Sequence, residues 1–246
     1  MEPYDLISVD WDHKQTAVWL ASVKRHCPDA NVILIEDRKP LPECWSSGKL
    51  GFMEDDFAKR SCKTGRTIYA DTDILFFSDI AVLFDKMGDT EIAVTKYTDW
   101  SDSGCTKRKN DHHISVLEYK NKITVYNNFN IALDAPYIHR SSGLIALKMG
   151  DPWTFFYAWK YMCHFILECG FPIKYNWFEE VALSLLCMSI DKLCVYNIPN
   201  YIHYNIPTRK ANINLNKIVA LHYHKPIRLK RFKEFAGCIE KLMTST

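Results

Sequence analysis

Residues 68–76 read Ile-Tyr-Ala-Asp-Thr-Asp-Ile-Leu-Phe, and this stretch carries the strongest signal in the chain. Thr67–Ala70 predicts a short buried strand, and two carboxylates, Asp71 and Asp73, follow at its end. On an extended backbone, residues i and i+2 project to the same face, so both carboxylates can approach one ion. Carboxylate oxygens favour Mg²⁺ or Mn²⁺. The alternative is that the pair caps a turn after the strand.

The segments before this stretch predict an α/β arrangement. Residues 4–9 and 31–36 are rich in apolar and β-branched side chains, as buried strands are. The apolar residues between about 14 and 27 predict a helix that ends before Pro28. A strand, a helix and a second strand in this order predict a right-handed parallel connection. We therefore expect a mixed central sheet flanked by helices.

Further elements are predicted along the rest of the chain. The alternation of side chains in residues 114–126 predicts a β-hairpin around Lys120 and Asn121. Asp151 predicts the N-cap of a helix that has Pro152 at its first position. The other elements we expect are strands at 91–95, 143–147, 193–197 and 218–221, and helices at 52–62, 178–190 and 229–243.

Length and cysteine content limit the class of protein. The chain has 246 residues, enough for one substantial core and too few for two full-sized domains. We find no apolar run near the roughly 18 residues that span a bilayer, and the N-terminus is acidic, unlike a signal peptide. The nine cysteines are scattered, without a C-x-x-C pair. These features predict a cytoplasmic, reduced protein without a transmembrane segment.

Positive charge is concentrated near the end of the chain. Residues 207–246 carry nine Lys and Arg against two Asp and Glu, and residues 107–109 add a second basic cluster. Such clusters could face the phosphates of a nucleotide or of a nucleic acid. A target base inside duplex DNA would then have to be flipped out of the stack. The alternative is a solvated helix face that only aids solubility.

Four motifs, in this order, resemble those of GT-A-fold glycosyltransferases. The first comprises residues 69–76 together with Ser78-Asp79-Ile80 and Leu83-Phe84, and it resembles the D-x-D region. The others are Ser-Ser-Gly-Leu-Ile at 141–145, Trp-Phe-Glu-Glu-Val-Ala-Leu at 177–183 and Leu-His-Tyr-His-Lys-Pro at 221–226. The chain is most similar to the family of glycogenin and bacterial lipopolysaccharide galactosyltransferases. The resemblance implies a single GT-A-like catalytic domain over residues 1–246.

The resemblance implies a metal site at the D-x-D motif. Asp71 would contact both the metal and the donor ribose, Asp73 would hold the metal, and Thr72 would lie between them against the donor. His222 would complete the protein ligands. Because the interval from histidine to lysine is shorter here than in the family, His224 is a rival to His222.

The resemblance also divides the chain by role. Residues 1–95 would form the nucleotide-binding half, and residues 96–246 would form the acceptor half and the C-terminal metal and diphosphate element. Lys225 would neutralise the diphosphate leaving group. The other residues that the resemblance places around the nucleotide and the sugar are Val9, Asp10, Trp11, Ser142 and Gly143. Ser142 stands where the family often has Asn.

Glu179 and Glu180 are the candidate catalytic carboxylates. They are adjacent, so they cannot both point in one direction from a helix, and we slightly prefer Glu180 as a base or an electrostatic stabiliser. An acidic first turn can also simply complement the helix dipole. The resemblance favours retention of anomeric configuration, whereas inversion would need one of these carboxylates beside the acceptor.

Together these features predict a metal-dependent, hexosyltransferase-like enzyme. It would use Mn²⁺ or Mg²⁺ and move a sugar from a nucleotide-diphosphate donor, expected to be a UDP-sugar, to a hydroxyl acceptor. The acceptor would be a glycan or a modified base in DNA. One alternative is a metal-dependent nucleotidyltransferase, which should carry a glycine-rich loop or more clustered carboxylates than we find. Another is a non-catalytic nucleic-acid-binding protein on the same fold.

Overall fold

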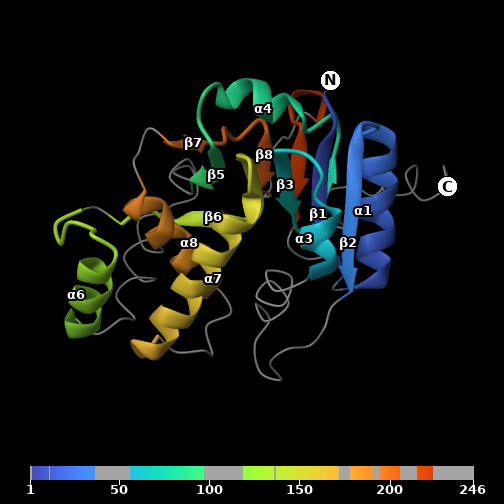
Figure 1. The fold of residues 1–246 in the computed structure, drawn as a ribbon. Coiled ribbons are helices and arrows are strands. Elements are labelled where there is room, and N and C mark those ends of the chain that lie inside the picture. The colour runs from blue at the N-terminus through green and yellow to red at the C-terminus, as the bar shows by residue number, and fades with distance from the viewer. Residues whose placement is uncertain are drawn as a thin grey trace.

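Two mixed β-sheets organise the chain, and helices cover both faces of the larger one (Figure 1). The computed structural model describes residues 2–10, 12–36, 56–96, 119–135, 137–171, 178–190, 194–205 and 215–223.

The larger sheet has six strands in the order β2-β1-β3-β6-β5-β7. In this sheet β1 is parallel to both β2 and β3, β6 is antiparallel to β3 and β5, and β7 is parallel to β5. The parallel β1–β2 pair joined by a helix was predicted from the sequence and is confirmed. The strands are β1 (Tyr4–Asp10), β2 (Ala30–Glu36), β3 (Arg66–Ala70), β5 (Ile92–Lys96), β6 (Arg140–Lys148) and β7 (Val195–Asn197).

Alternate side chains of the large sheet enter two different hydrophobic cores. In β3, Tyr69 packs with the helices α7 and α8, whereas its neighbours Ile68 and Ala70 pack with α1 and α4. This alternation follows from the period of two along a strand, and it requires apolar cover on both faces. The described helices are α1 (His13–His26), α3 (Asp56–Ser61), α4 (Val82–Met87), α6 (Tyr119–Asn128), α7 (Pro152–Glu168) and α8 (Phe178–Ser189).

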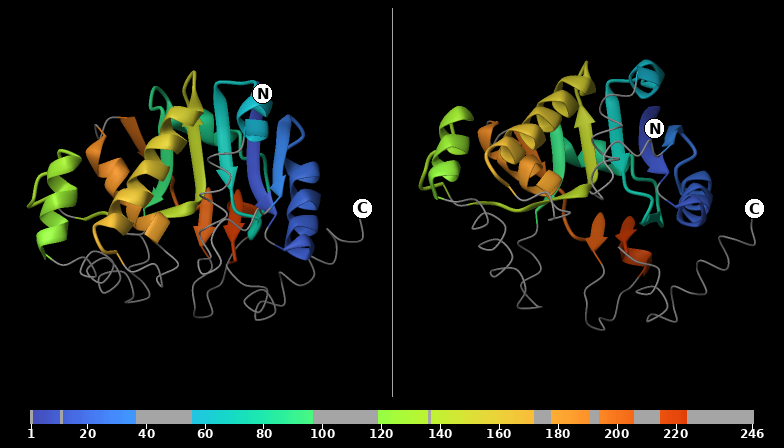
Figure 2. Two further views of the ribbon diagram at one scale, coloured as in Figure 1. Left: turned by 60° about the horizontal axis from the view of Figure 1, so that its bottom comes forward. Right: turned by 90° about the horizontal axis from the view of Figure 1, so that it is seen from below.

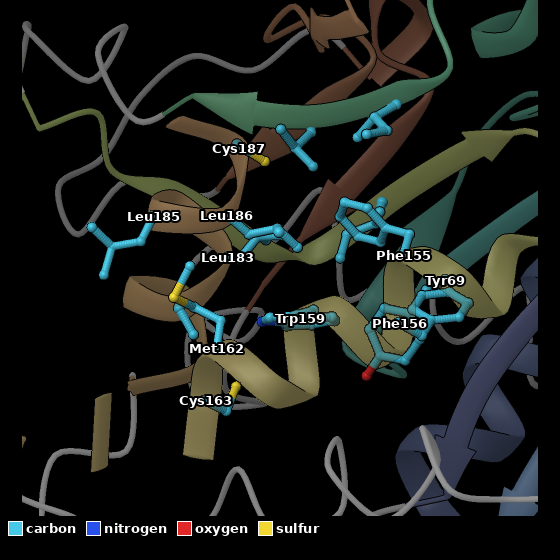
Figure 3. Close-up of a cluster of buried hydrophobic side chains, with 14 of the residues drawn as sticks. Tyr69, Phe155, Phe156, Trp159, Met162, Cys163, Leu183, Leu185, Leu186 and Cys187 are labelled. Atoms are coloured by element: carbon cyan, nitrogen blue, oxygen red, sulfur yellow. The ribbon is translucent and has the colours of Figure 1, made fainter. Parts of the chain in front are cut away.

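The core on the α7 and α8 side is aromatic. Figure 3 shows Tyr69 close to Phe156, with Trp159 further along the same helix and leucines of α8 facing it. Tyr69, Phe156 and Trp159 are each fully buried. The indole Nε1–H of Trp159 donates to the backbone oxygen of Glu179 at 2.9 Å. This hydrogen bond connects the centre of the core to the first turn of α8.

The smaller sheet has the order β4-β9-β8, and Figure 2 shows β8 and β9 set off from the large sheet. Its strands are β4 (Ile74–Phe76), β8 (His203–Asn205) and β9 (Ala220–His222). β9 is antiparallel to β4 and parallel to β8. A short 3₁₀ helix, Leu215–Lys217, precedes β9. Because β4 directly follows β3, the connection between them passes from one sheet to the other.

Most of the predicted elements are confirmed, but the hairpin at 114–126 is wrong where the structure describes it. Residues 119–128 form α6. Val125 and Tyr126 enter the core, and Phe129 packs edge-on against Phe165 of α7 at a centroid distance of 5.2 Å. An apolar spacing of one and four residues fits a helix better than a strand. The predicted polar loop at 99–113 and helix at 229–243 lie outside the described residues.

The predicted cap of α7 is confirmed and gives a stability test. An Asp151 carboxylate oxygen accepts the backbone N–H of Trp153 at 3.0 Å, and Pro152 occupies the first turn. Asp151→Ala should lower the free energy of unfolding by about 1 kcal/mol, because it leaves this N–H without its cap. Chemical denaturation measures the change. Asp151→Asn, which can still accept, is the control and should stay within about 0.5 kcal/mol of the parent.

Each helix in the described ranges is too short or too polar to cross a bilayer.

Candidate functional site

The Asp71-Thr72-Asp73 motif forms a turn between the two sheets. The backbone N–H of Ile74 donates to the oxygen of Asp71 at 3.0 Å, which closes the turn. The expectation that both aspartates project from one extended strand is therefore wrong, because β3 ends at Ala70. The N–H of Asp71 donates to Gly143 of β6 at 2.8 Å, while the N–H of Tyr223 donates to Asp73 at 3.0 Å. The turn is thus held by both sheets.

The turn still brings the two carboxylates together, and it brings them to His222. One ligand atom from each of Asp71, Asp73 and His222 lies within 4.8 Å of the other two. The His222 Nε2 and Asp73 Oδ1 atoms are 3.1 Å apart. His222 is the last residue of β9 and pairs with Ile74, directly after the turn. The pairing of β9 with β4 therefore places His222 beside the Asp71-Thr72-Asp73 turn.

These three residues fit a divalent cation. Two carboxylate oxygens and one imidazole nitrogen are ligands suited to Mn²⁺. Mg²⁺ would bind mainly through the two carboxylate oxygens. With metal–donor distances of about 2.0–2.2 Å, donors on opposite sides of an ion lie up to roughly 4.4 Å apart, so the cluster needs little closure. Beside it, the buried Thr72 hydroxyl has no hydrogen-bond partner within the described part of the chain. An orphaned buried hydroxyl at this position is consistent with a missing ligand.

Gly143 leaves the space in which His222 and Asp71 lie. A Cβ atom on residue 143 would be 2.5 Å from His222 Cε1, 2.9 Å from its Nδ1 and 3.3 Å from an Asp71 carboxylate oxygen. Real Cβ contacts of this kind essentially never fall below about 3.0 Å. Gly143 was expected beside the nucleotide and the sugar, and the structure places the side chains of His222 and Asp71 against it.

Tyr69 supports Asp71 from inside the core, and sequence reasoning missed this role. Its hydroxyl donates to Asp71 Oδ1 at 2.7 Å. Burial, and after it the negative charges of Asp71, Glu179 and Asp73, raise the pKa of the Tyr69 hydroxyl well above its usual value. The hydroxyl therefore stays protonated and remains a donor. The available signal was spacing, because Tyr69 and Asp71 stand two residues apart at the end of a strand.

The two candidate catalytic glutamates have different environments. Glu179 is buried, and its Oε1 accepts the Ser142 hydroxyl at 3.3 Å. Glu180 is partly exposed, and its Oε2 lies 3.1 Å from Nε2 of the buried His139, a residue that sequence reasoning missed. The electrostatic effect of Glu179 on Tyr69 connects Glu179 to the carboxylate cluster.

Val9 and Asp10 lie at the end of β1 but are not part of the cluster. Val9 is buried in the core shared with α7 and α8. The two carboxylate oxygens of Asp10 contact Thr16 Oγ1 and His13 Nδ1, each at 2.6 Å, so this side chain is engaged with α1. The expected contact of these residues with a nucleotide stays a prediction.

One contact region links the start of α1 to the turn at residues 71–73. Tyr223 follows His222 and is buried. Burial, and after it the charges of Asp73 and Asp12, raise the pKa of its hydroxyl. Asp12, which caps α1, is therefore near enough to act on the same tyrosine as Asp73. The expected donor residues Trp11 and Lys225, the rival ligand His224 and, apart from residues 215–223, the basic clusters lie outside the described residues.

Comparison with known proteins identifies the fold. No family model and no curated protein matches the sequence. The solved structure of the WbbM bifunctional glycosyltransferase in its apo form aligns with a TM-score of 0.52 and 12% identity, over 91% of this chain and 46% of that one. The galactosyltransferase LgtC, in complex with donor and acceptor sugar analogues, aligns with a TM-score of 0.50 and 12% identity, over 95% of each chain. This chain spans less than half of the WbbM structure and nearly all of LgtC.

These similarities confirm the fold class expected from the sequence. The chain has a GT-A-like glycosyltransferase fold, with a mixed central sheet flanked by helices. At 12% identity the comparison establishes the fold and leaves the chemistry to the residues of the site.

Proposed function

We propose, from the GT-A-like fold and the site that it carries, that this chain is a metal-dependent glycosyltransferase. It would transfer a sugar from a UDP-sugar to a hydroxyl acceptor. The observation that carries the proposal is the convergence of Asp71, Asp73 and His222 at the turn between the two sheets. A nucleotide diphosphate is the donor class that such a site suits, because its phosphate oxygens can fill the remaining coordination positions of a hard cation.

The residues of the turn would hold and orient the metal. Asp71 and Asp73 would supply oxygen ligands, His222 would supply a nitrogen, and the Tyr69 hydroxyl would fix Asp71 through the 2.7 Å hydrogen bond. A bound Mn²⁺ or Mg²⁺ ion would stabilise the charge that develops on the departing diphosphate. By resemblance, Lys225 would add a second positive charge there.

Ser142 and Glu179 would line the donor sugar. Their side chains meet at 3.3 Å, and Ser142 directly precedes Gly143 in β6. We propose a hexose as the transferred sugar and retention of its anomeric configuration, both supported by the motif resemblance. In place of Glu180, which the sequence favoured, Glu179 would then stabilise positive charge on the sugar, because it is the glutamate that meets Ser142. Glu180 would be oriented by His139. Inversion of the product anomer, observed by NMR, would instead give a glutamate the role of base.

The acceptor is proposed to be a glycan, with a modified DNA base as the second candidate. Support for the second candidate comes from the basic composition of residues 107–109 and 207–246. We also propose a reducing, cytoplasmic setting. The six cysteines within the described residues are free thiols, which supports this proposal.

Calorimetric titration with UDP tests the donor site directly. We expect binding in the presence of Mn²⁺ and at least tenfold weaker binding when EDTA replaces the metal, because the diphosphate contacts the protein largely through the ion. GDP and TDP serve as comparisons for the base. If the folded protein binds none of these nucleotides with metal, the transferase proposal is wrong, and binding to nucleic acid becomes the next assay.

A further inference from the structure

A second buried histidine lies behind the proposed metal ligand. His203 is in β8, the strand next to β9, and it is fully buried. Its Nε2 lies 3.3 Å from Nδ1 of His222. The two rings are nearly parallel, with an interplanar angle of 16° and centroids 5.3 Å apart. His203 therefore contacts the ring nitrogen of His222 that points away from Asp73.

The other nitrogen of His203 is also engaged. Its Nδ1 lies 2.5 Å from the hydroxyl oxygen of Thr95, which is fully buried in β5. The pairing of β5 with β6 shifts register between Val94 and Thr95. Such an irregularity turns a side chain away from its regular direction in the sheet. Thr95, His203 and His222 thus form a continuous hydrogen-bonded chain of side chains from the large sheet through the small sheet to the proposed metal site.

The order of contacts restricts where the protons can be. His222 presents Nε2 to Asp73, so Nε2 is the nitrogen that would bind a metal, and a ligating nitrogen carries no proton. The proton of a neutral ring is then on Nδ1, and His203 Nε2 must accept it. His203 in turn carries its own proton on Nδ1 and donates it to the Thr95 hydroxyl. With an ion between His222 Nε2 and Asp73, this arrangement also satisfies the contacts of His203 with His222 and with Thr95.

We propose that His203 is a positioning residue that holds His222 in the tautomer and ring orientation needed to bind the metal. This inference rests on the proposed function, and it deepens that proposal by assigning a support to one of its ligands. The outer partner of a metal-bound histidine commonly fixes its tautomer and raises its basicity. In the reverse arrangement, His203 would donate to His222, whose Nε2–H would then point at Asp73 and block the ion.

The metal-binding test uses Mn²⁺ with UDP, followed by the electron paramagnetic resonance signal of free Mn²⁺. His203→Phe keeps a flat ring but removes the acceptor, and we expect it to weaken Mn²⁺ binding by about 10–100-fold. His203→Gln can place an amide oxygen near the position of Nε2, so it should restore most of the affinity. Thr95→Val removes only the hydroxyl that contacts His203 Nδ1, so its Mn²⁺ affinity should fall between those of His203→Phe and His203→Gln. Circular dichroism and thermal unfolding show whether each variant is folded.

Equal Mn²⁺ affinity in parent and His203→Phe would overturn the inference while leaving the metal site intact. Failure of the parent to bind Mn²⁺ would instead count against the proposed function. A second measurement follows the protons directly, in protein that binds diamagnetic Mg²⁺ and UDP in place of Mn²⁺. In ¹⁵N spectra of the imidazoles of this Mg²⁺-loaded protein, we expect a proton on Nδ1 of His222 that exchanges slowly, and faster exchange in His203→Phe. A proton found on Nε2 of His203 and absent from Nδ1 of His222 would overturn the proposed direction.

Discussion

Asp73→Asn is expected to abolish metal-dependent UDP binding and to lower kcat/KM by roughly 100-fold or more. The substitution keeps the shape of the side chain but removes the charge from one of three candidate ligands. A metal ion supplies several kcal/mol of stabilisation to a departing diphosphate, and about 1.4 kcal/mol corresponds to a factor of ten in rate. Calorimetry with UDP and Mn²⁺, followed by transfer assays with a panel of UDP-sugars, measures both effects.

A matched control makes this result specific. Asp85→Asn makes the same chemical change on the exposed side of α4 and should leave UDP binding unchanged. Thermal unfolding of both variants without metal should resemble that of the parent, because loss of fold would also remove binding. Metal-dependent UDP affinity that survives in Asp73→Asn would place the metal elsewhere and would contradict the assignment of this turn.

Gly143→Ala is the second large expected effect, and it requires only one methyl group. The new Cβ would be 2.5 Å from Cε1 of His222. The ring cannot simply move aside, because it also contacts His203 at 3.3 Å and Asp73 at 3.1 Å. A displacement of about 1 Å in a catalytic arrangement can cost about 100-fold, so we expect a loss of that size in kcat/KM. The accompanying overpacking should cost about 1–3 kcal/mol in the free energy of unfolding.

Gly150 offers the control for this substitution. A Cβ atom there would meet no atom within 4 Å, so Gly150→Ala should leave both activity and Mn²⁺ affinity at the parent level. The two variants are compared by Mn²⁺ titration and by urea unfolding. Parental Mn²⁺ affinity in Gly143→Ala would show that the histidine and the aspartate do not act at the positions described.

Local patterns in the sequence were sufficient to predict the frame of the fold. The apolar runs of β1 and β3 read as buried strands because both faces of these strands are covered. The cap of α7 was predicted because Asp151 and Pro152 act through contacts within one turn. The D-x-D motif and His222 were also predicted, and the structure brings them together.

Features that depend on contacts between distant segments were not predictable in the same way. The turn at residues 71–73 could not be told from an extended strand, since its shape is set by β6 and β9 on either side. His203 lies in a three-residue strand, which is too short to show a pattern in the sequence. Its role becomes visible only when the folded chain places it beside His222. The apolar residues at 114–126 fit both the period of two of a strand and the period of about 3.6 of a helix. The contact of Phe129 with Phe165 of α7 favours the helix.

The position of the turn between two sheets also sets the order in which the site can form during folding. β1, α1, β2 and β3 are neighbours in sequence, whereas Asp73 needs β9, the last strand described, to hold it through Tyr223. Closing a long loop costs entropy before any contact compensates for it, so distant pairings tend to form late. We therefore expect a nascent or refolding chain to have most of its helices and its first strands before it can hold an ion. The site is therefore complete only after β9, late in the chain, has paired with β4, which follows the early strands.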